Sequence, residues 1–138
     1  MERIIGKKLK MDQIWKDDKV IGVTLVETKS EPAFEIGDMV KVSGTSKGRG
    51  FQGVVKRHGF HGGPKTHGQK NRLRAPGSIG STAPQRVTPG RRMAGRMGGE
   101  RVTVKNLRVV DIDKEKKIVF LRGALPGAKN SKVEIYKS

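Results

Sequence analysis

The chain has 138 residues, with 30 Lys and Arg against 13 Asp and Glu, a formal net charge of +17 and only 33% hydrophobic residues. No stretch of it approaches the roughly 20 apolar residues of a membrane helix, and a chain without cysteine excludes a disulfide or Cys-based zinc scaffold. The first residues show no apolar run typical of a signal peptide. We therefore expect a soluble, intracellular protein whose partner is a polyanion.

Short runs of β-branched and apolar residues, separated by turn residues, predict a mainly β fold. In chain order, strands are expected over 20–27, 36–42 and 51–56, and then over 102–112, 118–122 and 132–136. A weak helical periodicity occurs in 6–12, and Ile14 with Trp15 is expected in the core. Because the strand-bearing ends are short and closure removes exposed sheet edges, a small closed β-barrel is favoured.

The positive charge is concentrated in the middle of the chain. Residues 1–43 hold eight basic and eight acidic residues, 44–101 hold thirteen basic residues and one acid, and 102–138 hold nine basic and four acidic residues. The middle segment also holds 14 of the 19 glycines, and so little apolar surface that it cannot offset its own ordering entropy. We predict a barrel from 1–43 and 102–138 and a basic extension over 44–101. A flexible solubilising loop is the alternative.

The segment Gly44–Phe51 has the composition of a phosphate-cradling loop. Its glycines let backbone N–H groups approach phosphate oxygens, and Lys47 and Arg49 add charge. Its spacing differs from that of a Walker A loop. A glycine turn between two strands is the alternative interpretation.

Three histidines, His58, His61 and His67, lie within ten residues of one another. No acid occurs between Asp38 and Glu100, so these imidazoles lack the carboxylate or thiolate that usually completes a metal site. We expect them to stack on bases or to bond phosphates. For the same reason, catalysis is not expected, because general acid–base chemistry needs a second group nearby. No cofactor is predicted.

The stretch 75–85 is nearly uncharged and has arginines on both sides, which indicates a hairpin-like finger with a small neutral tip, or a simple Pro/Gly turn. Arg91 and Arg92 offer planar guanidinium groups for phosphate contacts and base stacking. Met93 and Met97 are expected to pack beneath the finger.

Several motifs spread over most of the chain resemble the ribosomal protein L3 family in its bacterial form. They are the segments 5–8, 42–60, 62–64, 66–68, 74–80, 93–98, 100–104 and 123–127. The resemblance implies a barrel of about six strands, related to that of translation elongation factors. It also implies a non-enzymatic constituent of the large ribosomal subunit in the bacterial cytoplasm. Such a protein binds large-subunit rRNA near its 3′ end early in assembly and touches neighbouring ribosomal proteins. An RNA chaperone or architectural protein acting off the ribosome is the alternative.

Carried over by position, the resemblance implies two sets of site residues. The rRNA-binding set is Lys47, Arg49, Lys56, Arg57, His58, His61, Lys65, His67, Lys70, Arg72, Arg74, Arg86, Arg91, Arg92, Arg96 and Arg101. The tip, expected near the peptidyl transferase centre, spans 79–86 and includes Ile79, Gly80, Ser81, Thr82, Ala83, Pro84 and Gln85.

Three positions depart from the family pattern. Only 28–35 join the strands at 20–27 and 36–42, where typical bacterial members insert a subdomain. Ala83 stands nearest to the tip glutamine that is methylated in some relatives, so that modification is not expected. Leu73 stands where relatives often have His.

Overall fold

The computed structural model describes residues 3–137. The chain forms two compact units, one made of Met1–Lys47 with Gly99–Ser138 and the other of Gly48–Gly98. The first contains six strands: β1 (Arg3–Lys16), β2 (Lys19–Thr28), β3 (Met39–Thr45), β6 (Arg101–Asp113), β7 (Ile118–Arg122) and β8 (Lys132–Lys137). The second contains β4 (Phe51–Gln52), α1 (Val54–His58) and β5 (Gly95–Arg96). No helix within 3–137 is long and apolar enough to cross a membrane.

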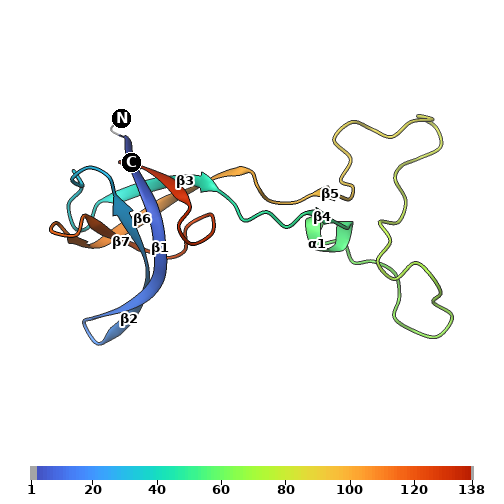
Figure 1. Ribbon diagram of the computed structural model, residues 1–138. Helices are drawn as coiled ribbons and strands as arrows, with labels where there is room; N and C mark the ends of the chain where they lie inside the picture. Colours follow the sequence, from blue (N-terminus) through green and yellow to red (C-terminus); the bar gives the residue numbers. More distant parts are fainter. Residues whose placement is uncertain (1–2, 138) are drawn as a thin grey trace. The chain divides into compact units, whose positions relative to one another are not determined.

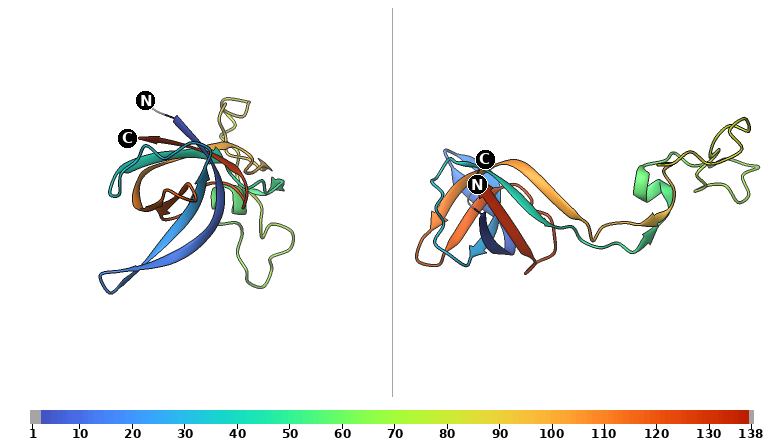
Figure 2. Two further views of the ribbon diagram at one scale, coloured as in Figure 1. Left: turned by 60° about the vertical axis from the view of Figure 1, so that its left-hand side comes forward. Right: turned by 90° about the horizontal axis from the view of Figure 1, so that it is seen from above.

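The six long strands form a closed antiparallel barrel in the order β1-β2-β7-β6-β3-β8 (Figures 1 and 2). The ring closes where Ile4 of β1 pairs with Ile135 of β8, and where β8 in turn pairs with β3. This confirms the predicted mainly β fold and the closed barrel. The strands expected around 20–27, 102–112, 118–122 and 132–136 are confirmed as β2, β6, β7 and β8.

The barrel interior is filled by alternating β-branched and aliphatic residues. Val40, Val119, Val133 and Ile135 are completely buried, as the inward positions of a closed sheet should be. Phe34, from the link between β2 and β3, joins the same cluster with 5% of its surface exposed. The short link is therefore sufficient to bring an aromatic side chain into the core.

Residues 3–16 form a strand, so the helical interpretation of 6–12 is wrong. Ile4, Gly6 and Lys8 face inward in alternation, and the lysine at the third inward position masked this pattern in the sequence. The core position expected for Trp15 is also wrong, because its side chain is 70% exposed. The reason is geometric: Trp15 pairs with Val20 near the turn of the β1–β2 hairpin, which projects past the other strands (Figure 1).

Two further strand predictions need correction. Residues 35–38 form a turn before β3, with Gly37 at φ +103° and the Asp38 N–H donating to the Glu35 carbonyl at 3.1 Å. Residues 51–56 are strand only at Phe51–Gln52, and the short helix α1 follows. Gly53 interrupts the strand. The helix then ends at Gly59, whose left-handed conformation lets its N–H bond the Val55 carbonyl.

Gly6 lies where the backbones of β1 and β2 approach closely. A Cβ at this position would lie 2.6 Å from Val26 Cγ1 and 2.9 Å from the Glu27 carbonyl oxygen. Overpacking of this kind typically costs about 1–3 kcal/mol. We expect Gly6→Ala to lower the free energy of unfolding by that amount in urea denaturation. Gly22→Ala in β2 is the matched control, since nothing lies within 4 Å of its Cβ position, and equal losses in both variants would contradict this account.

Candidate nucleic-acid interface

The helix α1 and the strand β5 hold two of the predicted rRNA-binding side chains in place. The Arg57 guanidinium donates to the Met93 carbonyl at 2.7 Å, and His58 Nε2 lies 3.0 Å from the same oxygen. A Cβ on Gly95 would lie 2.8 Å from Arg57 Nη1, so a larger residue at position 95 would make the guanidinium shift. Arg57 keeps further N–H donors for a ligand, because a guanidinium carries five.

The segment 60–75 forms a loop whose two ends meet. The Gly63 N–H donates to the Leu73 carbonyl at 3.0 Å, and a Cβ on Gly62 would overlap that same carbonyl oxygen. Gly62 has φ +78°, which glycine adopts without strain. This loop carries six of the predicted residues on its exposed surface: His61, Lys65, His67, Lys70, Arg72 and Arg74.

Two open hollows flank Phe60 within the second unit. One, of about 500 Å³, is lined by 88–92 and so includes Arg91 and Arg92. The other, of about 470 Å³, is lined by 60–64, Gln69, Arg72 and 75–77. Both combine an aromatic ring, guanidinium groups and bare glycine backbone. These are the groups that contact RNA bases and phosphates.

The predicted tip 79–86 is exposed throughout and is ordered by local bonds alone. Ser78 Oγ donates to the Gly80 carbonyl at 3.2 Å, and Gln85, at φ +51°, donates its N–H to the Thr82 carbonyl at 3.0 Å. Arg91 Nη2 reaches the Ser78 carbonyl at 2.8 Å. Of the two methionines expected beneath the finger, Met93 is 38% exposed and Met97 is half-buried.

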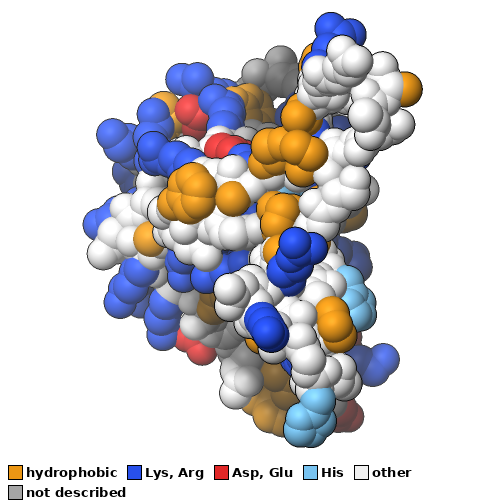
Figure 3. All heavy atoms as spheres, turned by 90° about the vertical axis from the view of Figure 1, so that its right-hand side faces the viewer, with side chains coloured by type: hydrophobic (Ala, Val, Ile, Leu, Met, Phe, Trp, Pro, Cys, Tyr) orange, Lys and Arg blue, Asp and Glu red, His pale blue; other side chains and the backbone are white. Residues whose placement is uncertain are grey.

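Charge in the second unit is of one sign. Residues 48–98 contain eleven Lys and Arg and no carboxylate, so no ion pair forms there within the described part of the chain. Val54 is the one residue of this segment that is buried. Figure 3 shows many Lys, Arg and His side chains on one face of the molecule and few Asp or Glu side chains. These cations are thus available to an external anion.

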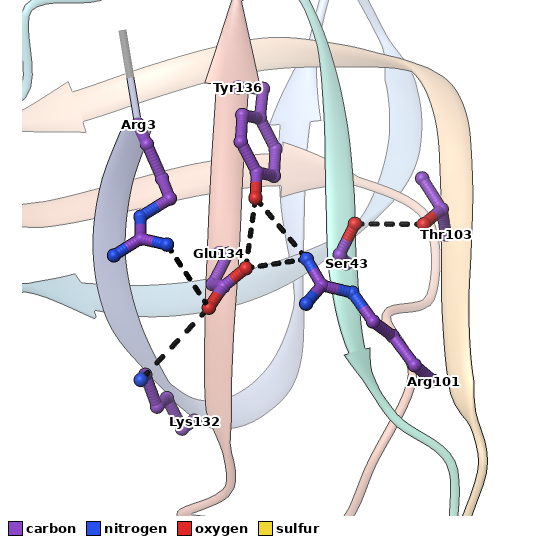
Figure 4. Close-up of polar contacts among 7 residues, drawn as sticks. All are labelled: Arg3, Ser43, Arg101, Thr103, Lys132, Glu134 and Tyr136. Atoms are coloured by element: carbon purple, nitrogen blue, oxygen red, sulfur yellow. Dashed lines mark hydrogen bonds and ion pairs between the residues drawn. The ribbon is translucent and has the colours of Figure 1, made fainter.

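Arg101 differs from the other predicted residues because it has a carboxylate partner. It lies at the start of β6, and its Nη2 donates to Glu134 Oε2 at 2.6 Å and to the Tyr136 hydroxyl at 3.2 Å (Figure 4). Glu134 also attracts Arg3 at 3.9 Å and Lys132 at 4.0 Å. The negative charge of Glu134 raises the pKa of Arg101. The guanidinium therefore contributes to a cross-strand network of the barrel.

This network makes Glu134 sensitive to acid. The hydrogen bond from the Tyr136 hydroxyl, followed by the charges of Arg101 and Arg3, holds the pKa of Glu134 below its ordinary 4.5. Its stabilising contribution is present above pH 4.5 and is lost as the pH falls through the lowered pKa. We expect the free energy of unfolding of Glu134→Gln to fall less than that of the wild-type chain as the pH is lowered. Urea denaturation at a series of pH values from about 7 to about 2 measures this. Glu115→Gln, on the exposed β6–β7 turn, is the control. Identical profiles for the two variants would contradict the prediction.

Lys8 is a structural position to which sequence reasoning assigned no role. It is 9% exposed, and its Nζ donates to the Leu125 and Gly127 carbonyls at 2.8 and 2.9 Å. Burial, and secondarily the charge of Lys47, lowers the pKa of Lys8. The side chain fixes the loop between β7 and β8. No local signal could reveal this role, because the acceptors lie more than a hundred residues away in sequence.

A small barrel joined to an acid-free cationic segment defines a protein suited to a polyanionic partner. The family model of ribosomal protein L3 matches residues 15–124. The chain is 61% identical over 106 residues, 76% of its length, to the large ribosomal subunit protein uL3 of Herpetosiphon aurantiacus. It is 52% identical over 134 residues, 96% of its length, to that of Roseiflexus sp., and 57% identical over 107 residues to that of Chlorobium limicola. The chain therefore belongs to the ribosomal protein L3 family.

The matches cover 50%, 64% and 51% of these three relatives, so the chain spans about half to two thirds of their length. The short link 28–35 is consistent with a shortened member of the family.

Proposed function

We propose that this protein is a structural constituent of the bacterial large ribosomal subunit in the cytoplasm, and that its basic extension binds large-subunit rRNA. The observation that carries this proposal is the second unit itself. Eleven cations, no carboxylate and one buried residue occur in 48–98, so the segment has neither internal ion pairs nor a core to determine its shape. RNA phosphates supply both the missing counter-charge and the missing surface.

The finer parts of the proposal follow from the family. Binding occurs early in assembly, the tip 79–86 extends toward the peptidyl transferase centre, and neighbouring ribosomal proteins contact the barrel. The local hydrogen bonds support the placement of the tip, because residues 79–85 form an uncharged and locally ordered turn that suits a crowded RNA surface. Arg101 takes a smaller share of RNA binding than the cations of 48–98, because Glu134 already neutralises it.

Arg91 and Arg92 provide a direct test of phosphate binding. We expect Arg91→Ala/Arg92→Ala to lower affinity for a transcript of the large-subunit rRNA 3′ domain. The variant should also flatten the slope of log K against log salt by about 0.7–0.9 for each phosphate that the chain no longer neutralises. Filter binding over a series of salt concentrations measures both quantities.

Lys114→Ala/Lys129→Ala removes the same charge from exposed barrel turns and is the control. An unchanged slope in the arginine variant would mean that these residues do not touch phosphate. Equal affinity of the wild-type chain for duplex DNA and for the transcript would favour the off-ribosome architectural protein instead.

A further inference from the structure

A second cationic surface lies on the barrel and includes none of the binding residues assigned above. A cleft of about 680 Å³ opens between the turn of the β1–β2 hairpin and strands β6 and β7. Lys16, Lys19, Arg108 and Arg122 line it, and Asp17 is the carboxylate among its lining residues. The remaining lining is largely apolar and includes Val20 and Ile36.

Arg108 and Arg122 form an unusual pair at this cleft. Val109 and Leu121 are the last pair of the antiparallel β6–β7 ladder at this end, and extending that register by one residue sets the two arginines opposite each other. Both also line a second hollow beside Met39 and Gly123. Like charges placed directly opposite each other destabilise a sheet. Within 3–137 neither guanidinium has an ion pair or a hydrogen bond, so the protein itself does nothing to relieve this repulsion.

An exposed aromatic side chain lies on the β1–β2 hairpin, whose turn borders the cleft. Trp15 pairs across the hairpin with Val20, which lines the cleft, and its indole is 70% exposed. Val20 and Ile36 are themselves 48% and 59% exposed. Guanidinium groups in the cleft and an accessible indole on the hairpin that borders it match the two parts of a nucleotide, because the arginines suit the phosphate and the ring suits the base. An acidic protein segment would pair with the cations but would bring no base to stack on the indole.

We propose that this cleft is a second RNA-binding site, in which Arg108 and Arg122 each contact a backbone phosphate and Trp15 stacks on an unpaired base. The inference rests on the proposed function, because it requires rRNA as the partner, but it assigns part of the contact to the barrel. Two separated sites on one chain tie two RNA segments together. Each site raises the effective concentration of RNA at the other.

The chain contains a single tryptophan, so its fluorescence reports on this site without a label. We expect the transcript of the large-subunit rRNA 3′ domain to quench Trp15 emission in the wild-type chain. Arg108→Gln/Arg122→Gln should abolish the quenching and flatten the salt slope by about 1.4–1.8, at about 0.7–0.9 per phosphate contact. The melting temperature of the free variant should stay constant or rise, because a like-charge pair has been removed.

The matched control is Lys114→Gln/Lys129→Gln, which lowers the charge equally on exposed turns outside the cleft and should leave the quenching intact. If the arginine variant does not fold, Arg122→Gln alone should give about half of the slope change. RNA binding in filter assays without any change in Trp15 emission would overturn this inference and leave the proposed function standing. Absence of RNA binding altogether would overturn both. Quenching by an acidic peptide such as poly-glutamate, but not by RNA, would assign the cleft to a protein partner and overturn the inference.

Discussion

Backbone amides of 60–94 should exchange with solvent at least about a hundredfold faster than those of β2 and β7 in the free protein, and should become protected when rRNA is added. The barrel strands are protected by ladders of hydrogen bonds over a buried core that includes Val26, Val119 and Leu121. The extension lacks both features. Exchange on the free chain therefore measures whether the cationic segment holds its shape alone.

The hydrogen bonds of this segment explain the size of the expected effect. Most of its backbone–backbone hydrogen bonds link residues only three apart, as in the bonds from Gln69 to Thr66, from Gln85 to Thr82 and from Arg91 to Thr88. Such turns contribute little stability when no apolar surface is buried beneath them. Bound RNA would exclude water and neutralise the repulsion among the cations. Protection should then rise across 60–94 together.

Hydrogen exchange followed by mass spectrometry, with and without the 3′-domain transcript, checks this expectation. Segment 48–58 is an internal comparison, because β4 pairs with β5 there and Val54 is buried. Strong protection of 60–94 in the free protein would contradict the idea that RNA determines the shape of the extension. It would also weaken the proposed function.

The strands that could be predicted are those in which buried apolar residues alternate with more exposed ones. In β7 the apolar residues Val119 and Leu121 alternate with more exposed neighbours, so the strand was predictable from local pattern. In β1 the third inward position is Lys8, which is tolerated there because two carbonyls distant in sequence accept hydrogen bonds from its ammonium group. Since those acceptors belong to the loop before β8, nothing near residue 8 could indicate a strand.

The prediction of a strand where α1 lies failed for a related reason. Val54 and Val55 are β-branched and favour a strand by propensity. The conformation is decided instead by the glycine before the helix and by Gly59 after it, with basic residues in the last turn where they complement the helix dipole. Tertiary context overrides a weak local preference in so short an element.

The candidate site was predictable to the extent that charge alone defines it. A segment with no acid cannot pair its own cations, and that conclusion needs no structure. What could not be foreseen is which cations have partners elsewhere in the fold. Arg101 meets Glu134 only because β6 and β8 both flank β3, and the Arg108–Arg122 pair exists only through the β6–β7 register.

Deletion of 80–85 should leave the affinity for the 3′-domain transcript nearly unchanged and should strongly impair peptide-bond formation by large subunits reconstituted with the variant. The six deleted residues carry no charge, so the phosphate contacts that dominate affinity remain. The base of the turn also survives, because the bond from Arg91 to the Ser78 carbonyl lies outside the deletion. The effect should therefore appear in function and assembly and not in binding.

A second variant separates the reach of the tip from its side chains. Replacing 80–85 with a Gly and Ser segment of equal length keeps the loop but removes Thr82, Ala83, Pro84 and Gln85. If only the length of the loop matters, this variant should restore puromycin reaction rates in reconstituted subunits. If the side chains of the tip make specific contacts, it should be as defective as the deletion. Wild-type rates in subunits that carry the deletion would show that the tip has no part in peptide-bond formation. In that case the proposal that the basic residues on either side of the tip bind RNA would be unaffected.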